Sequence, residues 1–278
     1  MNVDSAERTE SGPGKADQYP SENLVVIPTY NEAMNLARLV QRVLDVGAFD
    51  ILVVDDDSPD YTGALADGLA KNYPGRVMVL HRSGKLGLGT AYIEGFRYAL
   101  RAGYTRIFQM DADFSHDPDQ LPVLADALAG ADVVVGSRYV RGGSTAHWPL
   151  RRRVLSRMGS AYAATVLQLP IHDVTSGFKR FRRQALEALD FGIIRSNGYS
   201  FQIEVTFQCH QRGFRIVEMP ITFADRKAGQ SKMNGHIVTE ALLMVWRLRF
   251  DQVRRERMLP WTGSPSSPSS PSSPGTAG

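Results

Sequence analysis

Two carboxylates one residue apart, Asp111 and Asp113, follow directly on the apolar run 107–110. Residues i and i+2 of a strand point to the same side. Where a strand opens into a loop, two such side chains can converge on one hard divalent cation, whose remaining positions would take diphosphate oxygens. Asp is also common in turns at strand ends, so this spacing by itself leaves both interpretations open.

Three further polar loops follow apolar runs in the same way. They cover 28–32 (PTYNE), 55–60 (DDDSPD) and 84–89 (GKLGLG). Ligands of open parallel sheets bind beyond the carboxyl ends of the strands, and four such loops on one rim are more than turns require. Tyr30 offers a ring for stacking on a base, and Glu32 or Asp56 can accept hydrogen bonds from a base or a ribose.

The glycines match neither of two common nucleotide-binding patterns. Gly84, Gly87 and Gly89 would allow close backbone approach, but the third position of a G-x-G-x-x-G spacing is Tyr92. The pattern G-x-x-x-x-G-K-[ST] does not occur in the sequence. The sequence therefore argues against a Rossmann dinucleotide site and against a P-loop ATPase.

The elements that must position these loops alternate regularly as far as residue 135. Short apolar runs rich in β-branched residues alternate with amphipathic segments, which predicts β-α-β units and a mainly parallel sheet. Strands are predicted at 24–27, 51–54, 77–80, 107–110 and 133–135, and helices at 32–46, 61–72, 89–101 and 120–129. Beyond Gly136 the pattern predicts helices at 152–167, 183–189 and 201–211, and a strand at 216–223.

Composition indicates an ordinary globular protein. The 278 residues are 43% hydrophobic and 22% charged, and the net charge of +3 does not indicate a nucleic-acid partner. Cys209 is the single cysteine, so no intrachain disulfide is expected. The sequence predicts disorder in the polar segments 1–22 and 261–278, and it predicts neither a signal peptide nor a run of about 20 apolar residues that could span a bilayer. Any membrane association is therefore expected to be peripheral.

Residues 235–260 have the profile of an amphipathic helix, apolar in the first half and carrying five arginines in the second. This profile is typical of a helix at a lipid interface. A helix docked on the core, or paired with a partner protein, is the alternative. Basic residues also crowd into 138–157 and 179–183. They could meet phosphate or an anionic membrane, or form a solvated charged face.

Eight segments together resemble family-2 glycosyltransferases of GT-A fold, and among these the polyprenol (dolichol) phosphate mannose synthases. In order they are 26–32 (VIPTYNE), 53–60 (VVDDDSPD), 87–92 (GLGTAY), 110–116 (MDADFSH), 136–139 (GSRY), 175–178 (TSGF), 198–204 (GYSFQIE) and 226–232 (RKAGQSK). The resemblance implies an α/β GT-A domain at 23–234, with a Rossmann-like, mainly parallel central sheet flanked by helices, followed by the amphipathic interfacial helix.

The resemblance implies transfer of mannose from GDP-mannose, with Mg2+ or Mn2+, to a polyprenyl monophosphate on the cytoplasmic face of a membrane. The donor site that it implies comprises Pro28, Tyr30, Glu32, Val54, Asp56, Asp111, Ala112, Asp113, Lys179, Arg226 and Lys232. Asp111 and Asp113 would bind the cation. Related sequences often carry Gln where this chain has Ser115, so the third ligand stays open between Ser115 and water.

For the acceptor phosphate the resemblance implies Arg138, Arg152 and Ser176, and Arg138 would act in catalysis with the two aspartates. A phosphate monoester has a second pKa of about 6, so it arrives as a competent nucleophile without a strong general base. Attack opposite the leaving group would invert the sugar to a β-linked mannosyl phosphate. The segment 147–153 places a tryptophan beside three arginines. It could anchor the lipid head at the bilayer surface, or be an exposed basic helix start.

Two other functions fit the same residues. A glucosyltransferase that uses UDP-glucose and the same acceptor class is one, although its common relatives carry two C-terminal membrane spans that are not seen here. A nucleotide-binding regulatory module without turnover is the other, and retention of both aspartates argues against it. A recruiting integral membrane protein is compatible with the sequence, because one amphipathic helix gives modest anchoring.

Overall fold

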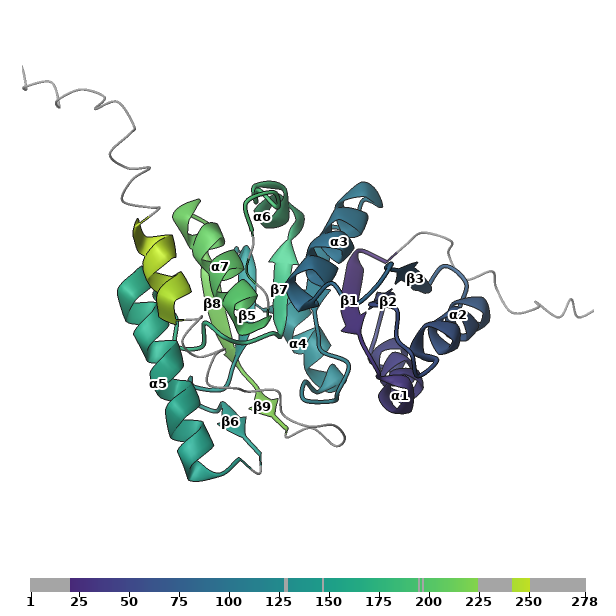
Figure 1. The fold of residues 1–278 in the computed structure, drawn as a ribbon, viewed down its shortest axis with the longest axis horizontal. Coiled ribbons are helices and arrows are strands. Elements are labelled where there is room, and N and C mark those ends of the chain that lie inside the picture. The colour runs from purple at the N-terminus through teal and green to yellow at the C-terminus, as the bar shows by residue number, and fades with distance from the viewer. Residues whose placement is uncertain are drawn as a thin grey trace, which may run out of the picture.

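A seven-stranded sheet in the order β3-β2-β1-β4-β7-β5-β8 forms the centre of the molecule (Figure 1). The computed structural model describes residues 21–127, 130–146, 148–194, 196, 198–224 and 242–250. Helices cover both faces of the sheet, and β6 and β9 form a separate two-stranded sheet. The predicted fold class, α/β with a mainly parallel central sheet flanked by helices, is confirmed.

The first half of the sheet consists of repeated strand–helix units. Its elements are β1 (Asn23–Thr29), α1 (Ala33–Asp45), β2 (Phe49–Asp55), α2 (Thr62–Asn72), β3 (Val77–His81), α3 (Leu88–Arg101), β4 (Arg106–Gln109), the 3-10 turn η1 (Pro118–Gln120) and α4 (Leu121–Asp126). β1 pairs in parallel with β2 and β4, and β2 pairs in parallel with β3. The four polar loops therefore share one rim of the sheet, as the sequence predicted.

The second half departs from this repeat. Its elements are β5 (Val133–Ser137), β6 (Ser144–Thr145), α5 (Leu150–Leu167), β7 (Lys179–Arg182), α6 (Arg183–Glu187), α7 (Gly198–Gln211), β8 (Ile216–Pro220) and β9 (Thr222–Phe223). β7 runs antiparallel between β4 and β5, and β8 is parallel to β5. The sequence did not predict β7, because its four residues include three basic ones. The strand predicted at 216–223 is wrong in one respect, since it divides at Ile221 into β8 and β9.

Strands buried on both faces explain the continuous apolar runs. Leu24 and Val26 of β1 pack beneath α3, whereas Val25 and Ile27 pack on the opposite face beneath α1. α3 lies very close to β1 at Gly95, where an added Cβ would come within 2.3 Å of Val26 Cγ1. This close approach fixes the helix that carries Tyr92 toward the rim.

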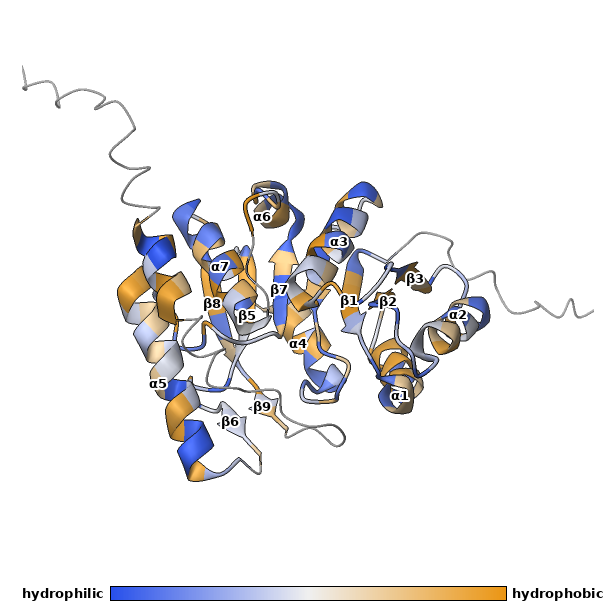
Figure 2. Cartoon of the chain, viewed as in Figure 1, coloured by the Kyte–Doolittle hydropathy of each residue, from blue (hydrophilic) through white to orange (hydrophobic). Residues whose placement is uncertain are grey.

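A third apolar cluster joins α5, α7 and residues 242–250, which are helical. Val245 is buried in it, and the Tyr162 hydroxyl of α5 donates to the Leu242 carbonyl oxygen at 3.4 Å. Figure 2 shows α5 as a mixture of strongly hydrophobic and strongly hydrophilic segments. Within the described residues, no helix has both the length and the hydropathy needed to cross a bilayer. The rest of the predicted helix 235–260 lies outside the described residues, as do 1–20 and 261–278.

Candidate active site

The Asp-Ala-Asp segment leaves the end of β4 with each carboxylate held by a nearby donor. The Tyr92 hydroxyl of α3 donates to Asp111 Oδ1 at 3.0 Å. The Ser115 backbone N–H donates to Asp113 Oδ1 at 3.0 Å, and the Asp111 backbone N–H donates to His116 Nδ1 at 3.2 Å. Tyr92 of α3, together with Ser115 and His116 of the loop after β4, therefore fixes the acidic pair in place.

The surroundings of this pair set the protonation of its neighbours. Burial, together with the carboxylates of Asp111 and Asp113, raises the pKa of Tyr92 well above its usual value, so the phenol stays protonated and donates. Burial lowers the pKa of His116, although the two carboxylates act in the opposite direction. His116 is therefore neutral near pH 7, and because Nδ1 accepts a hydrogen bond, its proton is on Nε2.

Unusual backbone conformations gather on the same rim. Five described non-glycine residues have positive φ, and four of them lie in the loops after β1, β2 and β4: Asn31, Asp57, Tyr61 and Phe114. This left-handed region disfavours bulky side chains such as those of Tyr61 and Phe114. The Arg38 guanidinium lies 4.5 Å from the Phe114 ring centroid and helps to hold this ring. Strain of this kind is characteristic of functional sites.

Two local features suit a divalent cation beside the carboxylates. The Ser115 hydroxyl is buried and has no hydrogen-bond partner. Gly177 faces the acidic pair, and a Cβ there would lie 3.5 Å from Asp111 Oδ2. Carboxylate and hydroxyl oxygens are suitable ligands for Mg2+ or Mn2+. The described residues contain no group of three or more His, Cys, Asp or Glu that could hold a metal. A cation here would therefore complete its shell with a hydroxyl, water or substrate oxygens.

Asp56, a predicted donor-site residue, closes the glycine loop onto the end of β2. Its carboxylate pairs with the Arg82 guanidinium and accepts from the Gly87 backbone N–H at 3.0 Å. Arg82 also donates to Glu94 at 3.1 Å and to Thr90 at 2.6 Å, and its side chain is only 2% exposed. Sequence reasoning missed Arg82, since a lone basic residue after a strand carries no distinguishing pattern.

The loops after β1 and β3 meet at Tyr30. The Lys85 ammonium lies 4.0 Å from the Tyr30 ring centroid. Glu32 Oε2 accepts a hydrogen bond from Asn35 Nδ2 at 2.9 Å, and the Glu32 backbone N–H donates to Thr62 Oγ1 at 2.9 Å. Tyr30 and Glu32 are partly exposed on the rim, as is Pro28. The structure thus brings these predicted donor residues to one edge of the sheet.

Three other predicted donor residues have side chains inside the core. Val54 is fully buried and Ala112 is 4% exposed, so they could contact a donor only through backbone atoms. Lys179 is also fully buried, and its ammonium donates to the carbonyl oxygen and to Oε1 of Gln202 on α7, at 3.0 and 2.9 Å. Burial lowers the pKa of Lys179 to about 7. The structure therefore does not bring Lys179 to the rim. Arg226 and Lys232 lie outside the described residues.

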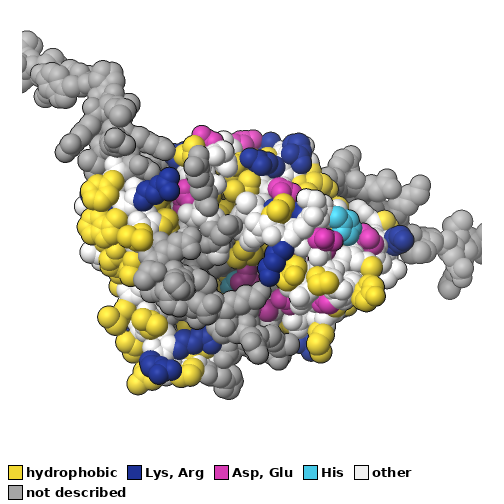
Figure 3. Space-filling view, in the orientation of Figure 1, with side chains coloured by type: hydrophobic (Ala, Val, Ile, Leu, Met, Phe, Trp, Pro, Cys, Tyr) yellow, Lys and Arg dark blue, Asp and Glu magenta, His cyan; other side chains and the backbone are white. Residues whose placement is uncertain are grey.

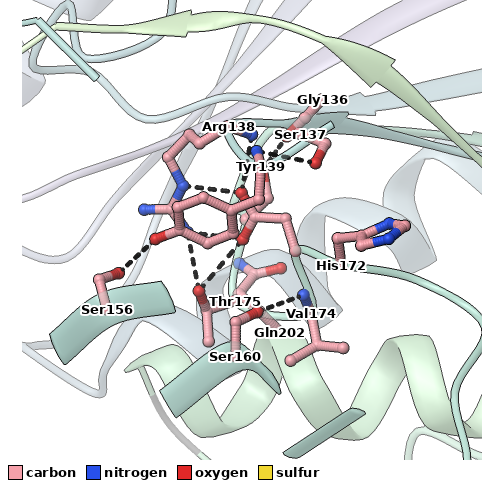
Figure 4. A network of polar contacts seen from close by, with 12 residues as sticks. Gly136, Ser137, Arg138, Tyr139, Ser156, Ser160, His172, Val174, Thr175 and Gln202 are labelled. Atoms are coloured by element: carbon pink, nitrogen blue, oxygen red, sulfur yellow. Dashed lines mark hydrogen bonds and ion pairs between the residues drawn. The ribbon is translucent and has the colours of Figure 1, made fainter. Parts of the chain in front are cut away.

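On the acceptor side, Arg138 follows β5 and forms a two-pronged ion pair with Asp173. Nε donates to Oδ2 at 2.7 Å and Nη2 to Oδ1 at 2.6 Å, with both side chains almost completely buried. Nη2 also donates to Thr175 Oγ1 at 2.7 Å, and the neighbouring Tyr139 hydroxyl donates to Ser156 Oγ at 2.7 Å (Figure 4). This geometry holds the guanidinium in one orientation.

The guanidinium groups of both predicted acceptor arginines, Arg138 and Arg152, lie over the ring of Trp148. The guanidinium carbon is 4.1 Å from the ring for Arg152 and 5.7 Å for Arg138. Trp148 is only 8% exposed and packs edge-on against Phe223 at 5.4 Å. The ring is therefore largely enclosed, and the role of segment 147–153 in holding the lipid head stays a prediction. Ser176, the third predicted acceptor residue, is buried, and its hydroxyl donates to the Gly136 carbonyl oxygen at 2.6 Å.

One aromatic row joins the two sides of the site. His116 stacks on Phe178 with ring centroids 5.0 Å apart, and it meets Phe223 edge-on at 5.4 Å. Phe223 in turn packs on Trp148. The row His116–Phe223–Trp148 therefore runs from the residue that holds Asp111 to the ring that both arginines face.

Residues 24–190 match the family model named glycosyl transferase family 2. This chain belongs to glycosyltransferase family 2. Polyprenol monophosphomannose synthase of Mycolicibacterium smegmatis is 47% identical over 254 residues, which cover 90% of this chain and 96% of that protein. Undecaprenyl-phosphate mannosyltransferase of Micrococcus luteus is 49% identical over 225 residues, covering 81% and 92%.

The solved structure of a mannosyltransferase from Pyrobaculum calidifontis, in complex with GDP-Man and Mn2+, shares the fold of this chain. Its TM-score is 0.52 at 17% identity, covering 88% of this chain and 68% of that one. At that identity the likeness concerns the fold alone. The fold and the family together establish that the chain is a glycosyltransferase.

Beside the acceptor side, the glycosyltransferase exposes a face that is both apolar and basic. Leu150 is 72% exposed and Met158 is 63% exposed on α5, which also carries exposed arginines at 151, 153 and 157. Trp246 and Phe250 stack at 5.8 Å on the adjoining segment 242–250 and are exposed as well. Figure 3 shows hydrophobic side chains gathered along this edge of the molecule. We refer to α5 and residues 242–250 together as the apolar–basic face.

Proposed function

We propose that this glycosyltransferase transfers mannose from GDP-mannose to a polyprenyl monophosphate, with inversion and with Mg2+ or Mn2+. The single observation that carries the proposal is the aromatic row, which places an acidic pair suited to a metal-bound diphosphate beside two arginines suited to a lipid phosphate. Two relatives named for mannose transfer to polyprenyl phosphates support the sugar and the acceptor. The fold relative solved with GDP-Man and Mn2+ supports the donor and the metal dependence.

The acidic pair would serve the leaving group. Asp111 and Asp113 would hold the cation, together with the Ser115 hydroxyl or water. Such a cation supplies neutralisation of the negative charge that develops on the departing diphosphate. Tyr92 and the Ser115 backbone N–H keep the two carboxylates oriented, so that little reorganisation is needed when the donor binds. Arg226 and Lys232 remain proposed as diphosphate ligands.

The acceptor side must bring the lipid phosphate, a second anion, toward the donor diphosphate. Arg138 is held by Asp173 and would contribute orientation, and the Arg152 guanidinium lies over the same Trp148 ring, where it would face the phosphate. One phosphate oxygen of the acceptor forms a bond to the anomeric carbon while the bond from that carbon to the diphosphate oxygen breaks. No proton has to be removed, because the acceptor phosphate is already ionised. Attack opposite the leaving group gives the β-linked product.

The proposed place of reaction is the cytoplasmic surface of a membrane, with the enzyme bound peripherally. The exposed apolar side chains and the arginines of the apolar–basic face fit the acyl boundary and anionic headgroups respectively. Arg152 lies in the first turn of α5, so a lipid phosphate at that surface would be near the proposed acceptor site. An integral membrane partner would strengthen this attachment.

The decisive experiment offers the purified protein both sugar nucleotides. Labelled GDP-mannose or UDP-glucose is incubated with a short-chain polyprenyl phosphate and Mg2+ or Mn2+, and the lipid product is extracted and analysed by NMR. We expect lipid-linked mannose with the β configuration, and its loss on addition of EDTA. Lipid-linked glucose as the main product would establish the UDP-glucose alternative. Nucleotide binding without any transfer would establish the regulatory module.

A further inference from the structure

Three buried polar atoms without a hydrogen-bond partner lie on the aromatic row or next to it in the chain. Ser115 Oγ, His116 Nε2 and Trp148 Nε1 are all buried without a hydrogen-bond partner. Buried polar groups normally form hydrogen bonds, and a buried polar group without one costs about 1–3 kcal/mol of stability. Three such atoms between the acidic pair and the arginines are therefore best explained as groups that bind a ligand atom.

His116 is the most completely fixed of the three. Its Nδ1 accepts from the Asp111 backbone N–H at 3.2 Å, which places the ring proton on Nε2. Phe178 stacks on one side of the ring and Phe223 lies edge-on to it, so the imidazole cannot turn without breaking these contacts. Nε2 is therefore an N–H donor held in one direction.

The position of the ring relates it to both substrates. The charged groups close enough to influence it come from both halves of the site: Asp111, Asp113, Arg138 and Asp173. A Cβ at Gly177 would lie 3.4 Å from His116 Cε1 and 3.5 Å from Asp111 Oδ2. The imidazole edge and the carboxylate thus border the same position, which a glycine leaves without a side chain.

We propose that the His116 Nε2–H donates a hydrogen bond to a phosphate oxygen where the donor diphosphate and the acceptor phosphate meet. This inference rests on the proposed function, because it needs two phosphate groups in one site. A preorganised N–H donor stabilises charge on such an oxygen. The oxygen belongs either to the diphosphate or to the lipid phosphate.

Two substitutions test the roles of Nδ1 and Nε2 of His116 separately. In His116→Asn the amide oxygen can replace Nδ1 and accept from Asp111, but no donor reaches the place of Nε2. In His116→Gln the longer amide can restore the donor. We expect His116→Asn to lower kcat/KM for transfer by about 10²-fold, with Mn2+ affinity measured by electron paramagnetic resonance within a few-fold of wild type. His116→Gln should keep at least tenfold more activity than His116→Asn.

Two further measurements identify the source of the oxygen. If it belongs to the diphosphate, His116→Asn weakens GDP binding in the presence of Mn2+, as measured by calorimetry. If it belongs to the lipid phosphate, GDP binding is unchanged and the KM for a short-chain polyprenyl phosphate rises. Either result supports the proposal. His210→Asn, near the C-terminal end of α7, is the control for a histidine substitution far from the row.

Wild-type activity in His116→Asn would overturn the proposal, and so would equal losses in both variants while thermal unfolding shows them folded. The proposed function fails separately, if the wild-type protein does not use GDP-mannose. The variants are therefore compared with whichever sugar nucleotide the wild type transfers, and the ratio between them still decides the role of His116.

Discussion

The donor side and the acceptor side of this site are assembled by different kinds of contact. Asp111 and Asp113 are held by His116 and Ser115, which lie within five residues of them on the same loop, and by one contact from Tyr92 of α3. Arg138 is held by Asp173, which is 35 residues away. The position of the acidic pair therefore follows mainly from its own strand and loop, whereas the position of Arg138 depends on the assembled tertiary structure.

The two sides also differ in how they carry charge. The acidic pair on the donor side consists of two carboxylates side by side, held among strained loops. On the acceptor side Arg138 and Asp173 form a buried ion pair, whose removal from water must be offset by excellent geometry. Substitutions of the acidic pair should therefore act mainly on catalysis, and substitutions of the Arg138–Asp173 pair on both stability and lipid binding.

Asp113→Asn should have the largest effect, because it keeps the shape of the loop and removes a charge that would hold the cation. We expect transfer to fall on the order of 10³-fold, equivalent to about 4 kcal/mol, with an unchanged melting temperature. Initial rates at several Mn2+ concentrations provide the measurement. Asp45→Asn, at the far end of α1, is the matched control. Full activity of Asp113→Asn would remove the cation from the mechanism.

Asp173→Asn should have the next largest effect. It tests whether the acceptor side can be changed without changing the donor side. The change leaves the buried guanidinium of Arg138 without its counter-charge, which typically costs about 3–5 kcal/mol of unfolding free energy. Urea unfolding measures that loss. The KM for polyprenyl phosphate should rise while GDP affinity with Mn2+ stays constant. An equal loss of GDP affinity would show that the acceptor side also shapes the donor side.

The same contrast explains what the sequence could predict. The strands β1 to β5 and the four rim loops were predicted because an apolar run followed by acidic or glycine residues is a local signal. Tyr30, Glu32, Asp111 and Asp113 come to the rim as expected. Their roles in binding stay predictions.

Residues set by distant pairing were not predictable in this way. Phe223 and Asp173 carry no local pattern, although they organise the acceptor side. Lys179 was assigned to the donor site, but β7 runs antiparallel beside β4 and pairs Lys179 with Gln109, so its side chain enters the core. A strand of three basic residues and one phenylalanine does not show the apolar periodicity from which a core position is inferred.

Tyr92→Phe should have a smaller effect than the two preceding substitutions, and it tests how far one hydrogen bond to Asp111 contributes to the donor side. The ring would keep its stacking on Phe201, at 5.9 Å between centroids, and lose only the hydrogen bond to Asp111. A hydrogen bond to a charged group contributes about 1.5–3 kcal/mol, so Mn2+ affinity should fall at least tenfold. Tyr98→Phe, on the same helix, is the control. If metal affinity is unchanged while stability falls, Tyr92 acts only as a core residue.

Met158→Glu should have the smallest effect, and it extends the comparison to the membrane. Met158 is 63% exposed on α5, away from the contacts that hold Arg138, so neither half of the site should change. An acidic side chain near an anionic surface costs about 1 kcal/mol, which corresponds to roughly fivefold weaker binding to vesicles. Sedimentation with anionic vesicles measures this, and turnover of a water-soluble short-chain acceptor should equal that of wild type. Unchanged vesicle binding would place the lipid contact elsewhere, because a charge inserted into a lipid-facing helix cannot be neutral in energy.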